Sequence, residues 1–270
     1  MSKKMMNELN KYLVQHGLRK GQHVLVHTSF RQLRSAFPGI TIEEFIETLK
    51  QKITKAGSLI MPAFTYCFKR SNGEHEIFDP KKSPGKVGAV PEVFRRQANV
   101  IRTSSATHSF ALWGKISEII SENNSPESPL GVGSVPDWMT NQEGSYIFLV
   151  GVDFGSLSYG HYLENITPVP WVDISPWDYM EVEKIGASTS GNQKLRELPG
   201  CSKPFRNFEQ YLLDKQIVEY HAYNGLKSLF LPVDLLYREG LKYFNSHQDK
   251  LLCRAGTCRA CEKKKKKLKE

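Results

Sequence analysis

Residues 146–151 read Tyr-Ile-Phe-Leu-Val-Gly, and this run decides the fold. An uninterrupted apolar run is typical of a strand that is covered on both faces, as strands are inside a parallel sheet. Residues 152–160 are rich in Gly and Ser and predict a turn, and a helix is expected to begin near Tyr159. A buried strand followed by a turn and a helix is the repeating unit of α/β proteins.

The same rhythm occurs closer to the N-terminus. Residues 23–27 and 58–61 are short apolar runs that predict strands, and residues 42–53 between them have apolar side chains at helical spacing. Thr41 and Glu44 form a capping-box pattern at the start of that helix. We therefore expect an α/β fold with a mostly parallel central sheet and helices on both faces.

The rest of the chain gives weaker patterns. Further elements are expected as helices over residues 5–16 and 87–97, strands over 100–101 and 109–113, and a long loop over 64–85. Beyond residue 165 the pattern is irregular, because several prolines interrupt any helix.

Length and composition favour one globular domain followed by a short tail. The chain has 270 residues, of which 40% are hydrophobic and 24% charged, so it can bury a core and is neither fibrous nor broadly disordered. No linker divides the chain before its Cys- and Lys-rich end. We expect a single α/β domain over residues 1–249 and a tail over residues 250–270.

Much of the net charge of +9 belongs to that tail. Residues 262–270 hold six Lys and two Glu, which leaves +5 on the rest of the chain. The lysine run 263–267 is expected to be a solvated, disordered block that makes at most a weak contact with anionic surfaces. No nucleic-acid-binding motif accompanies the charge, so no nucleic-acid partner is expected.

The sequence predicts a cytoplasmic protein. Its N-terminal residues are amphipathic and lack the apolar stretch and cleavage site of a secretory signal. No apolar run approaches the roughly 18–20 residues of a membrane helix. The five cysteines are sparse and odd in number, which favours reduced thiols over a disulfide framework.

His161 and Glu164 are candidate catalytic residues. If the helix that follows the 146–150 strand contains both, their i,i+3 spacing puts them on one face, at the carboxyl end of a buried strand where open α/β sheets bind ligands. A carboxylate beside an imidazole raises its basicity and helps to fix its orientation, which suits a general base near neutral pH. On spacing alone, a surface His beside a surface Glu is the commoner arrangement.

Thr28 and Ser29 follow the first predicted strand and precede Arg31. Hydroxyls, free backbone N–H groups at a helix start and a nearby arginine suit a diphosphate, although capping of a helix by Ser or Thr is more common. Residues 131–134 contain a Gly turn that completes neither a dinucleotide fingerprint nor a P-loop.

Residues 161–190 are acidic within a basic protein, with a net charge of −4. Asp173 and Asp178 lie there together with Trp171 and other aromatic residues. Carboxylates with aromatic walls suit a cationic or sugar-like ligand, and a solvated acidic loop beside core aromatics is an equal alternative.

The cysteines of the tail leave two interpretations open. Cys253, Cys258 and Cys261 have the spacing C-x4-C-x2-C, which imitates part of an iron–sulfur motif. A zinc site would need a fourth ligand, from Cys201 or from a histidine such as His247. The alternative is a mobile tail with free thiols, and no residue is assigned to a metal. Nucleophilic catalysis by Cys67 is disfavoured, since buried cysteines are more often inert.

These pieces together resemble the aminoglycoside 3-N-acetyltransferase family, also called the antibiotic N-acetyltransferase family, over roughly residues 18–240. Its landmarks occur in order at residues 25–29, 61–66, 78–84, 91–95, 109–114, 128–134 and 158–164, with a weaker echo at 199–202. The family fold is distinct from that of the GNAT acetyltransferases.

The resemblance implies acetyl transfer from acetyl-CoA to an amine of a sugar-like acceptor. It implies that His161 is the general base, with Glu164 as its partner, and that Ser158 keeps a hydroxyl beside the reacting carbonyl. Thr28, Ser29, Arg31 and the pair Ser109 and Phe110 fall in segments expected to line the CoA groove.

The sequence departs from the family pattern at Ser105–Ala106, Asp153 and Leu157, and it matches poorly after residue 168. We expect Asp173, Asp178 and Trp171 to contact the acceptor, which is either an aminoglycoside or an amino sugar. The alternatives are an N-acyltransferase that acts on a nucleotide-linked amino sugar for a surface polysaccharide, and a non-catalytic relative. A homodimer is one candidate assembly.

Overall fold

The structure is a computed structural model that describes residues 3–269. Residues 1–2 and 270, the outer ends of the two predicted parts, lie outside the described range, and the predicted boundary after residue 249 stays a prediction. The strands are β1 (His23–Thr28), β2 (Ser58–Pro62), β3 (Phe68–Arg70), β4 (Ile101–Arg102), β5 (Phe110–Gly114), β6 (Ser145–Val150), β7 (Val182–Ser188), β8 (Gly191–Lys194), β9 (His221–Tyr223) and β10 (Leu226–Pro232).

The helices are distributed along the whole described chain, singly or in pairs between the strands. They are α1 (Lys3–Gln15), α2 (Phe30–Ala36), α3 (Ile42–Ile53), α4 (Ala89–Arg95), α5 (Ile116–Ile119), α6 (Val135–Thr140), α7 (Ser158–Ile166), α8 (Phe205–Asp214), α9 (Val233–Ser246) and α10 (Arg259–Lys269), with 3-10 turns η1 (Phe154–Ser156), η2 (Asp178–Met180) and η3 (Gln248–Leu251).

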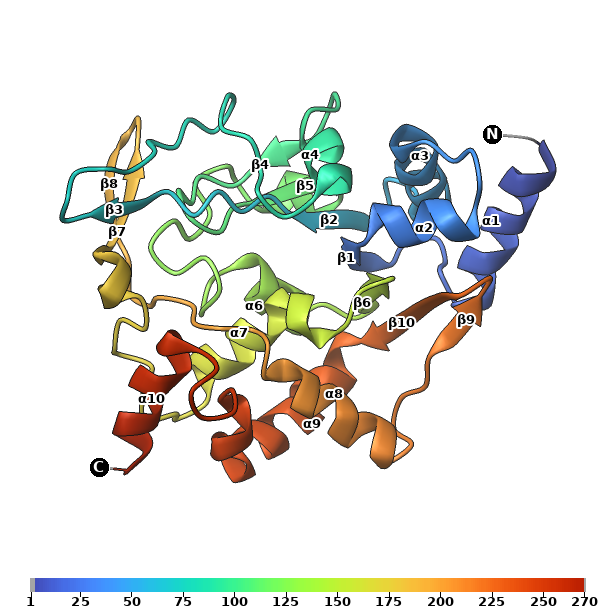
Figure 1. The fold of residues 1–270 in the computed structure, drawn as a ribbon. Coiled ribbons are helices and arrows are strands. Elements are labelled where there is room, and N and C mark those ends of the chain that lie inside the picture. The colour runs from blue at the N-terminus through green and yellow to red at the C-terminus, as the bar shows by residue number, and fades with distance from the viewer. Residues whose placement is uncertain (1–2, 270) are drawn as a thin grey trace.

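Seven strands of the described chain form the central sheet, in the order β4-β5-β2-β1-β6-β10-β9 (Figure 1). Strand β1 is parallel to β2 on one side and to β6 on the other. The outer pairs, β2 with β5, β4 with β5, β6 with β10 and β9 with β10, are antiparallel. The sheet is therefore mixed.

The prediction of a mostly parallel sheet was wrong beyond the three central strands. Residues 147–150 of β6 are apolar and buried because both faces of the strand are covered, and they are buried equally on the side of parallel β1 and on the side of antiparallel β10. An apolar run reports that a strand is buried, and it does not report the direction of the neighbouring strand.

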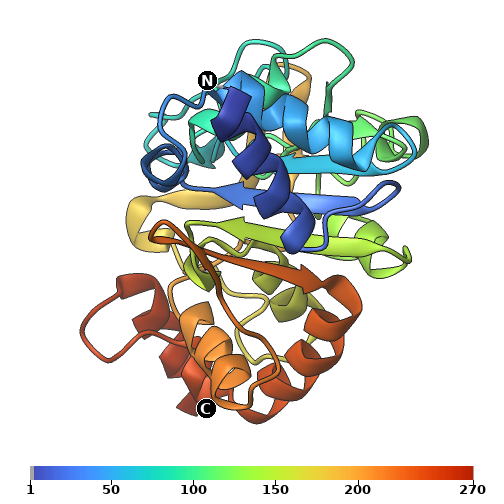
Figure 2. The ribbon, with the colours of Figure 1, turned by 90° about the vertical axis from the view of Figure 1, so that its right-hand side faces the viewer.

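Helices cover both faces of the sheet, as predicted (Figure 2). Alternate residues of β1 show the division, because Val24 and Val26 pack with the N-terminal helices, whereas Leu25 packs with the C-terminal ones. Helix α3 begins with the predicted capping box, in which Thr41 and Glu44 bond reciprocally. Two apolar cores thus hold β6, and whatever follows it, in a fixed position.

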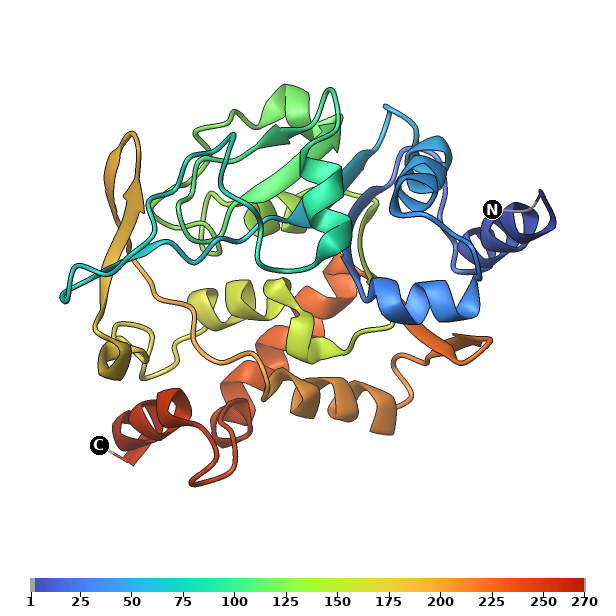
Figure 3. The same ribbon diagram turned by 45° about the horizontal axis from the view of Figure 1, so that its top comes forward.

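A small second sheet, β3-β7-β8, stands beside the central one (Figure 3). Its strands fall in residues 64–85, predicted as a loop, and in the irregular part after residue 165. They carry few apolar residues. Strand β3 pairs with β7 more than a hundred residues away, as in Phe68 with Gly186, whereas β7 and β8 pair as a local hairpin. Local periodicity therefore gave no signal for them. This sheet forms one wall of the cavity described below.

The C-terminal segment folds onto the domain. The 263–267 run, expected to be disordered, lies in helix α10, where Lys264 is only 3% exposed. The interpretation of a mobile tail was therefore wrong for the described residues up to 269. Helix α10 lies beside α7 and the segment that joins α7 to β7, since Lys264 pairs with Glu164 of α7 and Lys263 pairs with Asp178 of that segment.

Candidate active site

The site begins where β6 ends. After Val150 the chain turns at Gly151, whose φ of +67° belongs to the left-handed region, and a Cβ there would lie 2.7 Å from Cβ of Gln32. Only glycine fits this position without strain. The turn leads through η1 into α7, so that the first turn of α7 stands at the carboxyl end of the parallel strands, the place where α/β sheets bind ligands.

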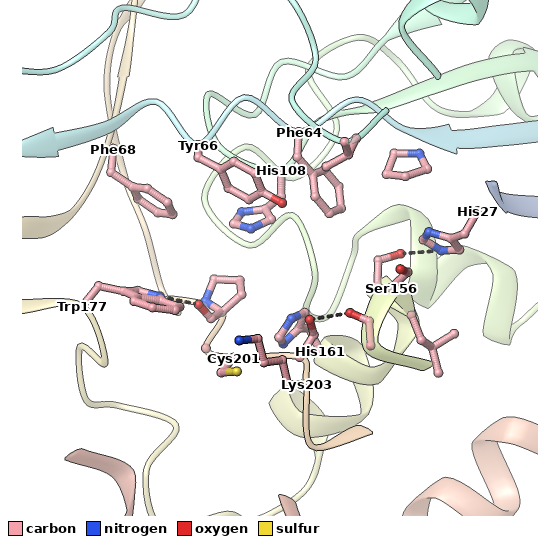
Figure 4. Close-up of a pocket in the computed structure, with 18 of the residues that line it drawn as sticks. His27, Phe64, Tyr66, Phe68, His108, Ser156, His161, Trp177, Cys201 and Lys203 are labelled. Carbon is pink, nitrogen blue, oxygen red and sulfur yellow. Dashed lines mark hydrogen bonds between the residues drawn. The ribbon is translucent and has the colours of Figure 1, made fainter. Parts of the chain in front are cut away.

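A cavity of about 660 Å³ opens in front of this helix start. Figure 4 shows aromatic side chains of the 62–70 segment on one wall, among them Phe64 and Tyr66, and His161 and Lys203 on the opposite wall. The lining also includes His27, His108, Ser158 and Trp177, as well as Arg70 and Cys201. Among the described residues that line the cavity, none is Asp or Glu.

His161 and Glu164 are close together, as predicted from their spacing. His161 Nδ1 lies 3.2 Å from Glu164 Oε2, and the two residues are 8% and 5% exposed. The commoner alternative, a pair on the surface, is thereby excluded. His161 lines the cavity, whereas Glu164 lies behind it. The carboxylate orients the ring through Nδ1, which leaves Nε2 as the nitrogen available to a ligand.

Glu164 has two further partners that the sequence did not indicate. Trp171 Nε1 donates a hydrogen bond of 2.7 Å to Glu164 Oε1, and Lys264 of α10 forms an ion pair with the same oxygen. Burial opposes ionisation of this carboxyl, but the Lys264 ammonium and the bond to His161 outweigh it and hold the pKa of Glu164 well below its usual range. Glu164 is therefore a carboxylate at neutral pH.

Two other histidines face the cavity in their neutral form. Burial lowers the pKa of His27 to about 4, and burial together with the nearby His161 lowers the pKa of His108 to about 3. His27 Nε2 lies 3.3 Å from Ser158 Oγ. Thr28 Oγ1 and His108 Nδ1 are buried without a hydrogen-bond partner among the described residues. Buried polar atoms of this kind are costly unless a ligand or water satisfies them.

The residues expected along a CoA groove separate into two groups. Thr28 lines the cavity, whereas Ser29 caps α2 and Arg31 of that helix is exposed. Ser109 is buried, accepts from Arg102 and donates to the carbonyl of Ala63, and Phe110 is a core residue. The landmark 109–114 thus supports the cavity wall from behind. The assigned roles of these residues stay predictions.

The residues expected to contact the acceptor are also dispersed. Trp171 is buried behind the cavity against Glu164, Asp173 is exposed outside it, and Asp178 pairs with Lys263 on α10. None of these three lines the cavity. Cys67 is buried as expected, and burial raises the pKa of its thiol. This keeps Cys67 protonated, which disfavours a nucleophilic role.

Sequence reasoning missed His27, His108, Lys203 and Lys264. His27 lies in the landmark 25–29, and His108 directly precedes the landmark 109–114, so inspection of the landmarks could have found both. No local pattern indicates Lys264, which is one lysine in a run of five and meets Glu164 a hundred residues earlier in the chain. No helix among residues 3–269 has the length and apolar character needed to span a membrane.

Comparison with known proteins identifies the family. The sequence profile described as aminoglycoside 3-N-acetyltransferase matches residues 25–245. A curated relative, aminoglycoside N(3)-acetyltransferase IV from Salmonella sp, is 31% identical over 166 residues, which cover 61% of this chain and 60% of the relative. The chain thus spans about three-fifths of the length of the curated relatives it matches.

Solved structures show the same fold. The apoenzyme of aminoglycoside acetyltransferase AAC(3)-IVa has a TM-score of 0.78 at 22% identity and covers 97% of each chain. AAC-IIIb in its binary complex with CoASH has a TM-score of 0.71 at 16% identity, covering 88% of this chain and 95% of that one. The profile match over most of the sequence, together with this shared fold, shows that the chain belongs to the aminoglycoside 3-N-acetyltransferase family.

Proposed function

We propose that this protein transfers an acetyl group from acetyl-CoA to an amine of an amino sugar. The observation that carries the proposal is the placement of His161, which stands on the cavity wall with a buried carboxylate bonded to its inner nitrogen. This arrangement is the one that a general base requires. The cysteine that lines the cavity, Cys201, belongs to a thiol cluster, so a direct transfer without an enzyme nucleophile fits best.

The proposed step needs one proton acceptor and one anion-stabilising group. The acceptor reacts as its neutral amine. The amine nitrogen bonds to the thioester carbonyl carbon, His161 Nε2 removes one proton from that nitrogen, and the carbon–sulfur bond breaks. The proton passes from His161 to the departing CoA thiolate. Base catalysis of this kind contributes roughly 10²–10⁴-fold, and the orientation of two bound substrates contributes further.

The start of α7 suits the oxyanion that develops on the carbonyl. Its N-cap is Leu157, which makes no side-chain cap, so the first N–H groups and the helix dipole remain available to an anion. Ser158 Oγ lies in the same turn beside the neutral His27. We assign Ser158 and these N–H groups to the carbonyl oxygen.

The cavity fits acetyl-CoA as co-substrate. Thr28 Oγ1 and His108 Nδ1 offer unsatisfied polar atoms, and Arg70 and Lys203 supply positive charge for phosphates. A related protein, AAC-IIIb, is known in complex with CoASH. The thioester supplies an activated acetyl group, and the residues of this chain orient it against His161.

The charge of the cavity also bears on the acceptor. AAC(3)-IVa has been solved in complex with a gentamicin, a compound that carries several amines. Among residues 3–269 no carboxylate lines the cavity, and Asp173 and Asp178, the expected partners of a cationic acceptor, lie outside it. An amino sugar that carries few positive charges, or one linked to a nucleotide diphosphate, therefore fits these walls better than a polycation does.

An acceptor screen tests the proposal. The full chain is assayed with acetyl-CoA by release of free CoA thiol, with a nucleotide-linked amino sugar, free glucosamine and gentamicin as acceptors, and with thioester hydrolysis as the blank. We expect release with the amino sugars and a higher kcat/KM for the nucleotide-linked one. A preference for gentamicin would overturn the charge reasoning. Binding of acetyl-CoA without transfer to any amine would favour a non-catalytic relative.

Other expectations are retained as part of the proposal. These are a cytoplasmic location, a homodimer, the lack of a nucleic-acid partner and a weak contact of the exposed tail lysines with anionic surfaces. Sizing chromatography with light scattering checks the homodimer. Liposome binding at low and high salt checks the contact with anionic surfaces, since attraction between exposed charges weakens as salt increases.

A further inference from the structure

Four of the five cysteines meet at one point beside the cavity. Cys201 precedes α8, Cys253 follows η3, and Cys258 and Cys261 stand at the start of α10. Their sulfur atoms all lie within 4.8 Å of one another, although Cys201 and Cys253 are 52 residues apart in the chain. We propose that these four thiolates bind one structural zinc ion, which fixes α10 to the acetyltransferase domain.

The spacing of the sulfurs fits a single tetrahedral ion. Zinc–sulfur bonds of about 2.3 Å at tetrahedral angles put neighbouring sulfurs about 3.8 Å apart. Cys201 Sγ and Cys253 Sγ lie 3.8 Å apart, which agrees with this value and is too far for a disulfide. A cluster of several irons would spread its thiolates farther than 4.8 Å, because the ligands would then lie on different metal atoms.

The backbone turns so that the last three cysteines can converge. Residues 254–257 form a turn, with Thr257 N–H donating to the carbonyl of Arg254 at 3.2 Å, and Gly256 takes a φ of +76°. Glu262 accepts from the N–H of Gly256 and closes the turn onto α10. The four residues between Cys253 and Cys258 therefore form the turn that reverses the chain. This reversal brings Cys258 close to Cys253.

Basic residues accompany the proposed ligands in the sequence. Arg254 and Arg259 flank the ligands in the sequence and offset the negative charge that four thiolates and one divalent ion would carry. Zinc meets these donors without redox chemistry, which suits four soft ligands in a closed site.

A metal explains why α10 is folded at all. Its buried residues are Ala260, Cys261 and Lys264, and Leu268 is partly buried against the core, so its apolar face is small. Lys264 nevertheless reaches Glu164 in the interior. Since all four ligand positions are filled by protein, the ion has no open position for a substrate, and its role is to hold α10 and therefore Lys264 in place.

Metal analysis of the full chain tests the site. Protein purified without chelators is expected to contain about one zinc ion per chain, as measured by elemental mass spectrometry. After exchange, Co²⁺ should give the thiolate-to-metal charge-transfer bands and strong d–d bands of a tetrahedral sulfur site. Cys258→Ser, which is not a cavity residue, should lower the zinc content to below about a tenth of an equivalent. Cys67→Ser, which changes the cysteine outside the cluster, should leave it unchanged.

Several outcomes would refute the proposed zinc site. Absence of metal together with failure to take up added Zn²⁺ or Co²⁺ would refute the site, as would an intact zinc content in Cys258→Ser. A mass lower by the hydrogens of a disulfide would show that the thiols pair with each other, and stoichiometric iron would refute zinc. If Cys258→Ser does not fold, the zinc and cobalt results on the unaltered chain decide. The test is independent of acetyl transfer, so failure of one proposal leaves the other standing.

Discussion

Helices α7 and α10 meet at one carboxylate, but different forces hold them there. Helix α7 lies in the apolar core, with Tyr159 and Leu163 fully buried. A Cβ on its Gly160 would lie 2.5 Å from the ring of Phe205, so the two helices that carry these residues are in close contact. Helix α10 contains six lysines and is attached through two ion pairs and a cluster of thiols.

The difference separates how the proposed base, His161, is placed from how the charge beside it is set. Packing fixes the position of His161 and Glu164, because a close-packed helix has little freedom to shift. Lys264 arrives on an element with little apolar surface, and it acts on Glu164 through charge. A helix that hydropathy assigns to solvent can thus complete a buried site when polar contacts and a metal hold it.

The largest effect is expected from His161→Ala, a change in helix α7, which apolar packing holds in place. We expect kcat to fall by roughly 10²–10⁴-fold, while acetyl-CoA binding stays within a few-fold, because the base acts on the acceptor amine. Steady-state kinetics and calorimetric binding measure the two quantities. His247→Ala, outside the cavity, is the matched control. Normal turnover in His161→Ala would remove the base from the mechanism, and loss of CoA binding alone would make His161 a structural residue.

The ion pair that attaches helix α10 is tested by Lys264→Met, which keeps the bulk of the side chain and removes its charge. Breaking a buried ion pair from one side costs about 3–5 kcal/mol, since Glu164 would stay buried without its ammonium. Denaturant unfolding measures the loss, with the exposed Lys266→Met as control. Restoration of stability in the double variant Lys264→Met/Glu164→Gln would show direct coupling. Equal stability of Lys264→Met and Lys266→Met would show that α10 contributes nothing to the interior.

Variants in the two helices are expected to shift the pH–rate profile in opposite directions. Glu164→Gln removes a negative charge beside His161, so the acidic limb of kcat/KM should move down by about one pH unit, with a lower kcat. Lys264→Met removes a positive charge from the same place and should move that limb upward. If both variants leave the limb in place while activity persists, the charges around Glu164 do not act on the base.

The smallest expected effect concerns acid stability. His108 has its folded pKa lowered to about 3, below the ordinary value, so the unfolded chain binds the proton more readily. Its contribution to stability is complete above the unfolded pKa near 6.5 and is lost as pH falls toward the folded value. His108→Phe should therefore reduce the loss of unfolding free energy between about pH 7 and pH 5.5 by about 1 kcal/mol. An unchanged pH dependence would contradict the neutral state of His108.

Elements with a local sequence signal were predicted, and pairings between distant strands were not. The strands β1, β2 and β6 and the capped helix α3 were predicted from sequence, because burial and capping are visible in neighbouring residues. The direction of β5 and β10 and the pairing of β3 with β7 were not, because these pairings join residues far apart in the chain. The expected acceptor residues Asp173 and Asp178 were inferred from local charge, which does not report whether a loop faces a cavity.

The sequence by itself determined the family, through ordered landmarks, and the pairing of His161 with Glu164, because a spacing of three residues on a helix brings side chains together wherever that helix lies. Tertiary structure alone decided that Lys264 neutralises Glu164 and that Cys201 completes the thiol cluster. The physical reason is sequence separation. Contacts across 100 and 52 residues depend on how the layers pack, and no local periodicity encodes that packing.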